Sequence, residues 1–146
     1  MSVDRIFVDY SIDRLRRHSE RIEKRLAELG EDRVWARGAE DANAIGNLVL
    51  HLCGNVRQWI IASIGGAPDT RIRDQEFATK GGVPVPELTD RLHGTVDEAV
   101  AVLQGLTPER LLQRIHPQNH DVSVLEAVYH VVEHFAWHAG QIVSAT

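Results

Sequence analysis

The feature that most constrains the fold is a helical repeat of apolar residues, which recurs in four long stretches of the chain. The first stretch runs from about Val3 to Leu29, and the second from about Asp41 to Ile64. The third follows Pro86 as far as Leu106, and the fourth begins at Ser123 and continues to the C-terminus. In each stretch apolar residues recur three and four positions apart, which is the spacing of one face of an α-helix. Four such helices bury their apolar faces most simply in a four-helix bundle, so an all-α fold is predicted.

Residues with known effects on helix ends mark the limits of these stretches. Gly30 suits the position just past a helix C-terminus. Thr107 followed by Pro108 is typical of an N-cap and a first helical residue, which predicts one short extra turn. Ser123 and Glu126 form a capping-box pattern at the start of the last helix.

The length of 146 residues predicts one domain, residues 1–146. Hydrophobic residues make up 43% of the chain and charged residues 25%, as in ordinary globular proteins. Residues 65–85 are rich in Gly, Pro and charge and have no clear period, so we expect a long loop there. No stretch shows β-alternation, and no strand is predicted.

Several functional classes are disfavoured by the sequence. No apolar run approaches the roughly 20 residues that cross a bilayer, and the N-terminus lacks a signal-peptide pattern, so a cytoplasmic location without a membrane partner is expected. The net charge of −5, without a long basic block, argues against nucleic-acid binding. The single Cys53 cannot form an intrachain disulfide, in agreement with a reducing compartment, and is expected to be a small buried residue.

Histidine is the unusual residue of this chain, with eight copies, three of them four residues apart in the last helix. His130, His134 and His138 lie on one side of that helix. On a helical projection His138 is nearest the edge of the apolar face, His134 is next and His130 is farthest from it. Because two imidazoles one turn apart can bind one divalent ion, His134 and His138 are the preferred pair of metal ligands and His130 is the reserve.

A third ligand must come from another helix, and His51 is the best candidate. It projects beside the apolar face of the second helix, on the shoulder that also carries Asn55. Three neutral imidazoles would leave a coordination position open, as in catalytic zinc sites. The alternative is that these histidines are ordinary core or boundary residues, and their spacing alone does not decide between the two. For the isolated His18 the ordinary role is preferred.

Two segments resemble the DinB/YfiT-like superfamily: NLVLHLCGNVRQWI, from Asn47 to Ile60, and LEAVYHVVEHFAWHAGQI, from Leu125 to Ile142. The resemblance implies a four-helix bundle with up-down-down-up connectivity that encloses a divalent metal, often zinc or nickel. It implies the ligands His51, His134 and His138, the same residues that the projection selects. It also implies relatives that are thiol transferases using bacillithiol, mycothiol or glutathione, or metal-dependent hydrolases or isomerases, and frequent dimers.

On these grounds we expect a divalent-metal-binding protein that acts as a thiol S-transferase or as a hydrolase of a small molecule. The expected substrate is a small-molecule thiol, and the expected assembly is a homodimer. Arg57 projects nearly opposite His51 and ranks low among the polar residues available to place a substrate. Those residues are Asn55, Arg57, Asn119, His120 and Gln141. Two alternatives stay open: a non-catalytic metal-binding or stress-associated bundle, and a plain helical dimer whose histidines are incidental. Three imidazoles suit several transition metals, so the sequence does not identify the ion.

Overall fold

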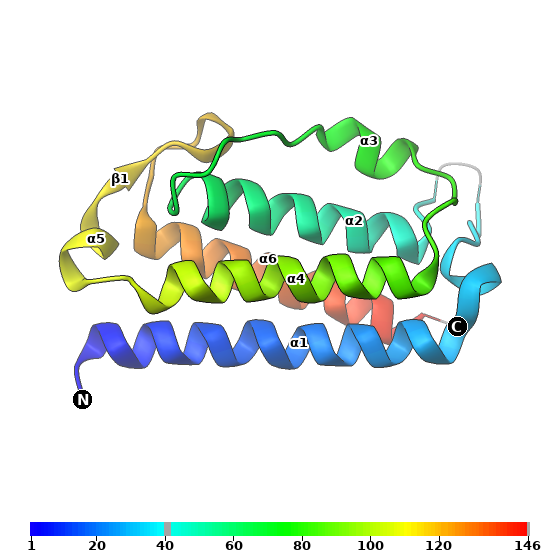
Figure 1. Cartoon of the computed structure of the whole chain (residues 1–146), viewed down its shortest axis with the longest axis horizontal. Coiled ribbons are helices and arrows are strands. Elements are labelled where there is room, and N and C mark those ends of the chain that lie inside the picture. The colour runs from blue at the N-terminus through cyan, green and yellow to red at the C-terminus, as the bar shows by residue number, and fades with distance from the viewer. Residues whose placement is uncertain (40–41, 146) are drawn as a thin grey trace.

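The computed structural model describes residues 1–39 and 42–145, in which four long helices pack side by side (Figure 1). They are α1 (Val3–Val34), α2 (Ile45–Val56), α4 (Val85–Gln104) and α6 (Val124–Ser144). The π-helical turns η1 (Arg57–Ala62) continue α2. Helices α1 and α6 run in one direction and α2 and α4 in the other (Figure 1). The predicted all-α bundle with up-down-down-up connectivity is therefore confirmed.

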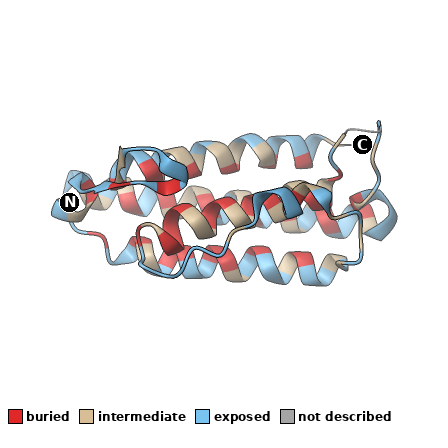
Figure 2. Cartoon of the chain, turned by 90° about the horizontal axis from the view of Figure 1, so that it is seen from above, coloured by how far each residue is buried: buried red, intermediate tan, exposed pale blue. Residues whose placement is uncertain are grey.

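Each long helix contributes one apolar face to a common core. Helix α1 packs against α4 and α6, and α2 packs against the same two helices from the other side. Leu15, Leu52, Leu92 and Phe135, one from each helix, have no exposed surface. Burying a side chain of this size contributes about 1.5–3 kcal/mol. Buried residues consequently line the inner sides of the helices, whereas exposed residues cover the outside (Figure 2).

Two predicted helix starts are confirmed in atomic detail. The Ser123 hydroxyl accepts a hydrogen bond from the Glu126 backbone N–H at 3.1 Å, and the Glu126 carboxylate accepts one from the Ser123 N–H at 2.9 Å. The Thr107 hydroxyl accepts from the Arg110 N–H at 3.1 Å and begins the short helix α5 (Pro108–Leu112). These bonds satisfy backbone donors that have no partner within the helix.

The ends of the first two helices differ from the predicted ones. Gly30 has φ 77° and ψ 173°, so the regular helix is interrupted there as expected. The chain then makes one further turn over residues 31–34, which buries Val34 completely. The predicted start of the second helix, Asp41, lies outside the described residues, and the helix begins at Ile45.

The prediction of a structureless loop over residues 65–85 is wrong in part, because the segment contains the short helix α3 (Arg73–Ala78). The Asn47 side-chain amide of α2 donates hydrogen bonds to the carbonyl groups of Glu76, at 2.9 Å, and Thr79, at 2.7 Å. Tertiary bonds to a buried asparagine hold this helix on the bundle, and they leave no periodic pattern in the sequence. We call residues 65–84 the strap.

The prediction that no strand forms is also wrong. Residues Arg114–Ile115 (β1) and Val122–Ser123 (β2) pair antiparallel, but two residues are too short to show an alternating pattern. Between them, Gln118 and Asn119 in the 3₁₀ turn η2 (Pro117–Asn119) have φ of 49° and 64°, an uncommon conformation outside glycine.

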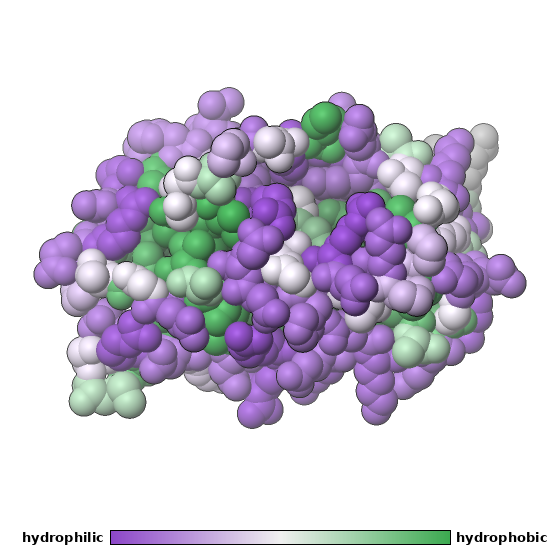
Figure 3. All heavy atoms as spheres, viewed as in Figure 1, coloured by the Kyte–Doolittle hydropathy of each residue, from purple (hydrophilic) through white to green (hydrophobic). Residues whose placement is uncertain are grey.

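The outer surface in the orientation of Figure 1 is mainly hydrophilic, with an apolar area over the C-terminal ends of α2 and α4 (Figure 3). Among the described residues, no helix has both the length and the apolar character needed to cross a membrane.

Candidate metal centre

Three histidines from two helices converge between α2 and α6. His51 comes from α2, and His134 and His138 come from successive turns of α6. The Nε2 atoms of His51 and His134 are 3.0 Å apart. The ring centroid of His138 lies 5.1 Å from that of His51 and 4.6 Å from that of His134. The structure thus brings the three sequence-predicted residues together, one from α2 and two from α6.

The spacing of the ring nitrogens fits one small ion. One nitrogen from each of the three rings lies within 4.8 Å of the others. In a tetrahedral zinc site with bonds of about 2.0–2.1 Å, ligand nitrogens lie roughly 3.3 Å apart. Only small side-chain movements separate the present arrangement from that geometry, so this cluster could hold a metal ion.

The electrostatics keep the α6 histidines in the neutral form that binds metals. Burial, with the neighbouring rings of His138 and His51, lowers the pKa of His134 to about 3. Burial also lowers the pKa of His138, against the effect of a 2.7 Å contact between its Nδ1 and the Gln141 side-chain oxygen. Both rings are therefore uncharged at pH 7 and have a lone pair to offer.

Two buried polar atoms near this cluster have no hydrogen-bond partner among the described residues. They are Nδ1 of His134 and Oδ1 of Asn55, which lies one turn along α2 from His51. Buried polar atoms are nearly always paired, and each unpaired one costs about 1–3 kcal/mol. Unpaired buried atoms of this kind are expected at a site whose side chains are arranged to bind a ligand.

A buried ion pair lies behind His51 and was not predicted from the sequence. The Oε1 atom of Glu76 is 3.0 Å from Nδ1 of His51, and Arg71 donates to both Glu76 oxygens, at 2.8 and 3.0 Å. Burial alone would raise the pKa of the Glu76 carboxyl, but the hydrogen bonds from His51 and Arg71 outweigh it and hold the pKa below its ordinary value. Glu76 is therefore a carboxylate at neutral pH. Arg71 and Glu76 both belong to the strap, and no sequence pattern predicts their position beside His51.

His130, the reserve ligand, is not part of the group of three. Its ring stacks on Trp59, with centroids 4.2 Å apart and planes inclined by 27°. The Trp59 ring also lies 5.8 Å from His120 and donates from Nε1 to the Gln118 side chain at 3.0 Å. Phe77 lies on the His51 ring, with centroids 4.9 Å apart. Aromatic rings thus border the three histidines.

The other candidate residues separate into two groups. Gln141 contacts His138, and Asn55 lies on the buried face beside His51. Arg57 instead binds Glu98 of α4 through both terminal nitrogens, at 3.1 and 3.2 Å, away from His51 as its projection predicts.

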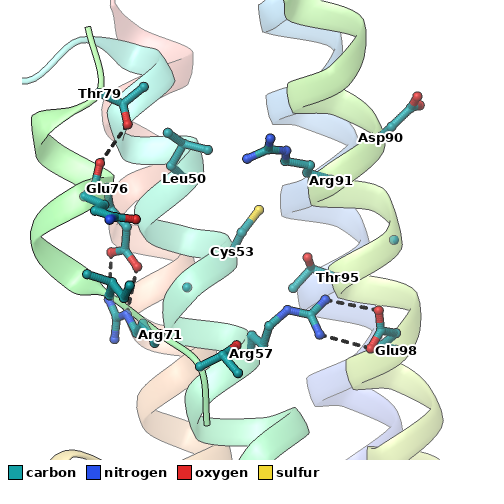
Figure 4. A pocket seen from close by; sticks show the side chains of 15 residues that line it. Leu50, Cys53, Arg57, Arg71, Glu76, Thr79, Asp90, Arg91, Thr95 and Glu98 are labelled. Atoms are coloured by element: carbon teal, nitrogen blue, oxygen red, sulfur yellow. Dashed lines mark hydrogen bonds and ion pairs between the residues drawn. The ribbon is translucent and has the colours of Figure 1, made fainter. Parts of the chain in front are cut away.

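A cavity of about 520 Å³ opens between α2, α4 and the strap (Figure 4). Arg71 and Glu76 line it, but the three histidines do not. Cys53 also faces it and is half-buried rather than fully buried, and burial raises the pKa of its thiol to about 11. The cavity and the histidine cluster therefore share the Arg71–Glu76 pair.

Comparisons with known proteins agree with this architecture. The family described as "Protein of unknown function (DUF1572)" matches residues 2–146. None of the curated proteins matches the sequence. A conserved protein from Enterococcus faecalis is similar in structure with a TM-score of 0.78 and 20% identity, covering 99% of this chain and 95% of that one.

Two structures of a mycothiol-dependent maleylpyruvate isomerase are also similar. The TM-scores are 0.73 for a histidine-to-alanine mutant and 0.67 for the other structure, at 12% and 13% identity. All of this chain is covered in both, but it spans only 65% of the length of the isomerase. At these identities the similarity shows the DinB-like fold alone.

Proposed function

The chain belongs to the DUF1572 family, within the DinB/YfiT-like superfamily, and we propose that it is a metal-dependent enzyme that activates a thiol or a water molecule against a small-molecule substrate. The proposal is carried by one observation: imidazoles from α2 and α6 point their nitrogens at a common small volume. His51, His134 and His138 are the proposed ligands, and zinc or nickel is the proposed ion because imidazole suits both.

Three protein ligands leave one position of a tetrahedral ion open, which is typical of catalytic rather than structural sites. A divalent ion held there supplies Lewis acidity, which lowers the pKa of a water or thiol that reaches it. The side chains of His134 and His138 are partly exposed, which supports access from the α6 side. Phe77 and the Trp59–His130 stack offer apolar surfaces against which a substrate would lie.

The properties of the chain's own cysteine favour a nucleophile that comes from outside the chain. Cys53 is the one cysteine in the sequence, it faces the α2–α4 cavity, and its raised pKa makes its thiolate scarce at pH 7. The nucleophile is therefore proposed to arrive as a small molecule. The shared fold with a mycothiol-dependent isomerase favours a low-molecular-weight thiol, and hydrolysis is the second form of the same proposal.

The test begins with metal analysis of protein purified without a histidine tag. We expect about one zinc or nickel per chain, and its loss in His51→Ala and His134→Ala. His93→Ala is the matched control, because His93 is exposed on α4 and contacts Glu23 rather than the cluster. Near-zero occupancy, with no thermal shift on adding zinc or nickel, would contradict the proposal.

Activity is tested with the metal-loaded protein and three thiols, bacillithiol, mycothiol and glutathione, each with a small electrophile. Metal-dependent consumption of one thiol supports transfer, and metal-dependent cleavage of an ester supports hydrolysis. Tight metal binding without turnover of any thiol or ester would instead favour a non-catalytic metal-binding protein. In that case the ion would stabilise the bundle by linking α2 to α6.

A homodimer is proposed from the apolar side chains that remain exposed on two neighbouring helices. Tyr129 and Trp137 of α6 are 64% and 71% exposed, and Leu125 is 38% exposed. Ile6 and Tyr10 of the adjacent α1 are 55% and 54% exposed. Exposed apolar surface of this kind is typical of an interface when it is contiguous.

A further inference from the structure

Glu76 is linked to the histidine cluster by a short chain of buried contacts. Its Oε1 atom is 3.0 Å from Nδ1 of His51, and Arg71 binds both carboxylate oxygens. Arg71 also donates from Nη1 to the Gln58 side chain at 2.9 Å, which fixes the direction of its guanidinium. The side chains of His51, Glu76 and Arg71 are 8%, 9% and 3% exposed, so water competes little for these bonds.

The neighbours of His51 determine which of its nitrogens carries the proton. A carboxylate only accepts hydrogen bonds, and a guanidinium only donates them. An Nδ1 lone pair would face the Glu76 oxygen at 3.0 Å and repel it, whereas an Nδ1 proton would be donated to it. The Arg71 Nη2 atom lies 3.2 Å from Nδ1 and favours the opposite tautomer, but it is farther away and already binds Glu76. The shorter contact therefore favours a proton on Nδ1 and a lone pair on Nε2.

Gly54 allows the carboxylate to lie this close to α2. A Cβ atom at residue 54 would lie 1.8 Å from Oε2 of Glu76 and 2.9 Å from Nε of Arg71. Residue 54 follows His51 by three positions and so lies on the same side of the helix. Figure 4 shows the Arg71–Glu76 pair against α2. The glycine in the segment HLCGN thus makes room for the group that contacts the histidine.

We propose that Glu76 is a positioning residue of the metal centre: held by Arg71 and packed over Gly54, it keeps the His51 proton on Nδ1 and directs the Nε2 lone pair toward the ion. The inference rests on the proposed role of the three histidines as metal ligands. A carboxylate behind a ligand imidazole fixes its tautomer and orientation and makes it a better donor. The strap is then part of the metal centre although it supplies no ligand.

The first test measures Zn²⁺ affinity by competition with a chromophoric chelator. We expect Glu76→Ala to weaken binding by about 10- to 100-fold. Glu76→Gln retains an acceptor oxygen but no charge, and its loss is expected to be smaller. Glu98→Gln is the matched control, because Glu98 forms the other arginine–carboxylate pair of the same cavity and contacts no histidine. Zn²⁺ binding by Glu76→Ala within about twofold of the wild type would overturn the proposal.

The second test uses ¹⁵N NMR of the imidazole rings in metal-free protein. The wild type is expected to carry the His51 proton on Nδ1, and Glu76→Ala to move it toward Nε2. A proton on Nε2 in the wild type, or the same tautomer in the variant, would overturn the inference. A wild type that binds no Zn²⁺ would contradict the proposed function. The NMR measurement needs no metal, so it would still show whether Glu76 sets the tautomer of His51. If Glu76→Ala does not fold, as judged by circular dichroism, the wild-type tautomer decides alone: a proton on Nδ1 supports the inference and a proton on Nε2 overturns it.

A third test uses the close approach at Gly54. Gly54→Ala is expected to weaken Zn²⁺ binding as much as Glu76→Ala, because the methyl group displaces the carboxylate. Combined with Glu76→Ala, Gly54→Ala should weaken Zn²⁺ binding little more than Glu76→Ala alone, because the carboxylate that the methyl group displaces is already absent. Gly94→Ala is the control: Gly94 lines the same cavity from α4, and a Cβ there would meet no atom within 4 Å. Additive losses would contradict the proposed role of Gly54.

Discussion

The His134 ring packs against His51, and its buried Nδ1 atom has no hydrogen-bond partner among the described residues. Burial and the neighbouring rings also oppose its protonation and bring its pKa to about 3. An apolar side chain would avoid the unpaired nitrogen. The presence of histidine at this position is therefore better explained by binding than by stability.

We expect His134→Leu, in the presence of a chelator, to change the free energy of unfolding by about 1 kcal/mol or less, because the unpaired Nδ1 is removed but Nε2 of His51 loses its partner at 3.0 Å. With zinc at 100 times its dissociation constant, the wild type should gain about 2.7 kcal/mol and the variant nothing. Urea unfolding with and without zinc measures both effects. Equal stabilisation of the wild type and the variant by zinc would show that His134 is not a ligand.

His130 differs from the other α6 histidines because its ring stacks on Trp59, with centroids 4.2 Å apart, and lies farther from His134, with centroids 6.0 Å apart. His130→Ala should therefore leave Zn²⁺ affinity within about threefold of the wild type, while losing about 0.5–1.5 kcal/mol of stability from the ring pair. Chelator competition and urea unfolding measure the two quantities. A loss of zinc binding as large as that of His134→Ala would place His130 among the ligands.

Residue spacing predicted the three histidines that meet, but it could not predict their surroundings. His134 and His138 are one helical turn apart, and a projection of each helix found the side on which His51 lies. Glu76 reaches His51 because side chains such as Asn47 bind the strap to α2, and a contact between residues 25 positions apart leaves no local signal.

At the level of elements, α3 is held on the bundle by a few side-chain hydrogen bonds, and Asn47 makes two of them. Asn47 is fully buried, accepts from the Ala44 N–H at the start of α2, and donates to two strap carbonyls. Asn47→Ala removes the partner of the Ala44 N–H and two bonds to the strap, although Arg37 still donates to the Thr79 carbonyl at 3.1 Å, and it should lower the free energy of unfolding by about 2–3 kcal/mol. Faster amide exchange in α3 should accompany the loss.

Gln75→Ala is the control for this prediction, because Gln75 is exposed on α3 and such substitutions change stability by about 0.5 kcal/mol or less. Equal effects of the two substitutions would show that the strap is not held through Asn47. Zn²⁺ affinity should fall in Asn47→Ala as well, because Glu76 moves with the strap.

The long helices were predictable because each repeats its apolar spacing over several turns, whereas the short elements were not. Helix α3 has six residues and β1 and β2 have two each, so no period can be recognised in them. The second helix was expected to continue regularly to Ile64, but it changes to π-helical turns at Arg57. A π-turn contains an extra residue, and a projection at about 100° per residue no longer applies beyond that point.

At the scale of the whole molecule, the exposed apolar residues of α1 and α6 raise the question of a partner. Helices α1 and α6 pack side by side in the same direction, so the exposed residues of their N-terminal turns lie at one end of the bundle (Figure 1). A stable interface buries at least about 1,000 Å² of total surface. A second copy of the chain, placed on these helices, would cover the apolar side chains on both copies by symmetry.

We expect light scattering after size-exclusion chromatography to give twice the 16.3 kDa mass of one chain. Tyr129→Glu should shift the protein toward monomer, because it places a charge among the apolar side chains that the dimer would bury. Ile72→Glu is the control: Ile72 is 58% exposed, similar to Tyr129 at 64%, but it lies on the strap. If the wild type elutes as a monomer at tens of micromolar, or if both substitutions act alike, the exposed residues of α1 and α6 do not form this interface. Zn²⁺ affinity should be unchanged in a monomeric Tyr129→Glu variant, because all three proposed ligands come from one chain.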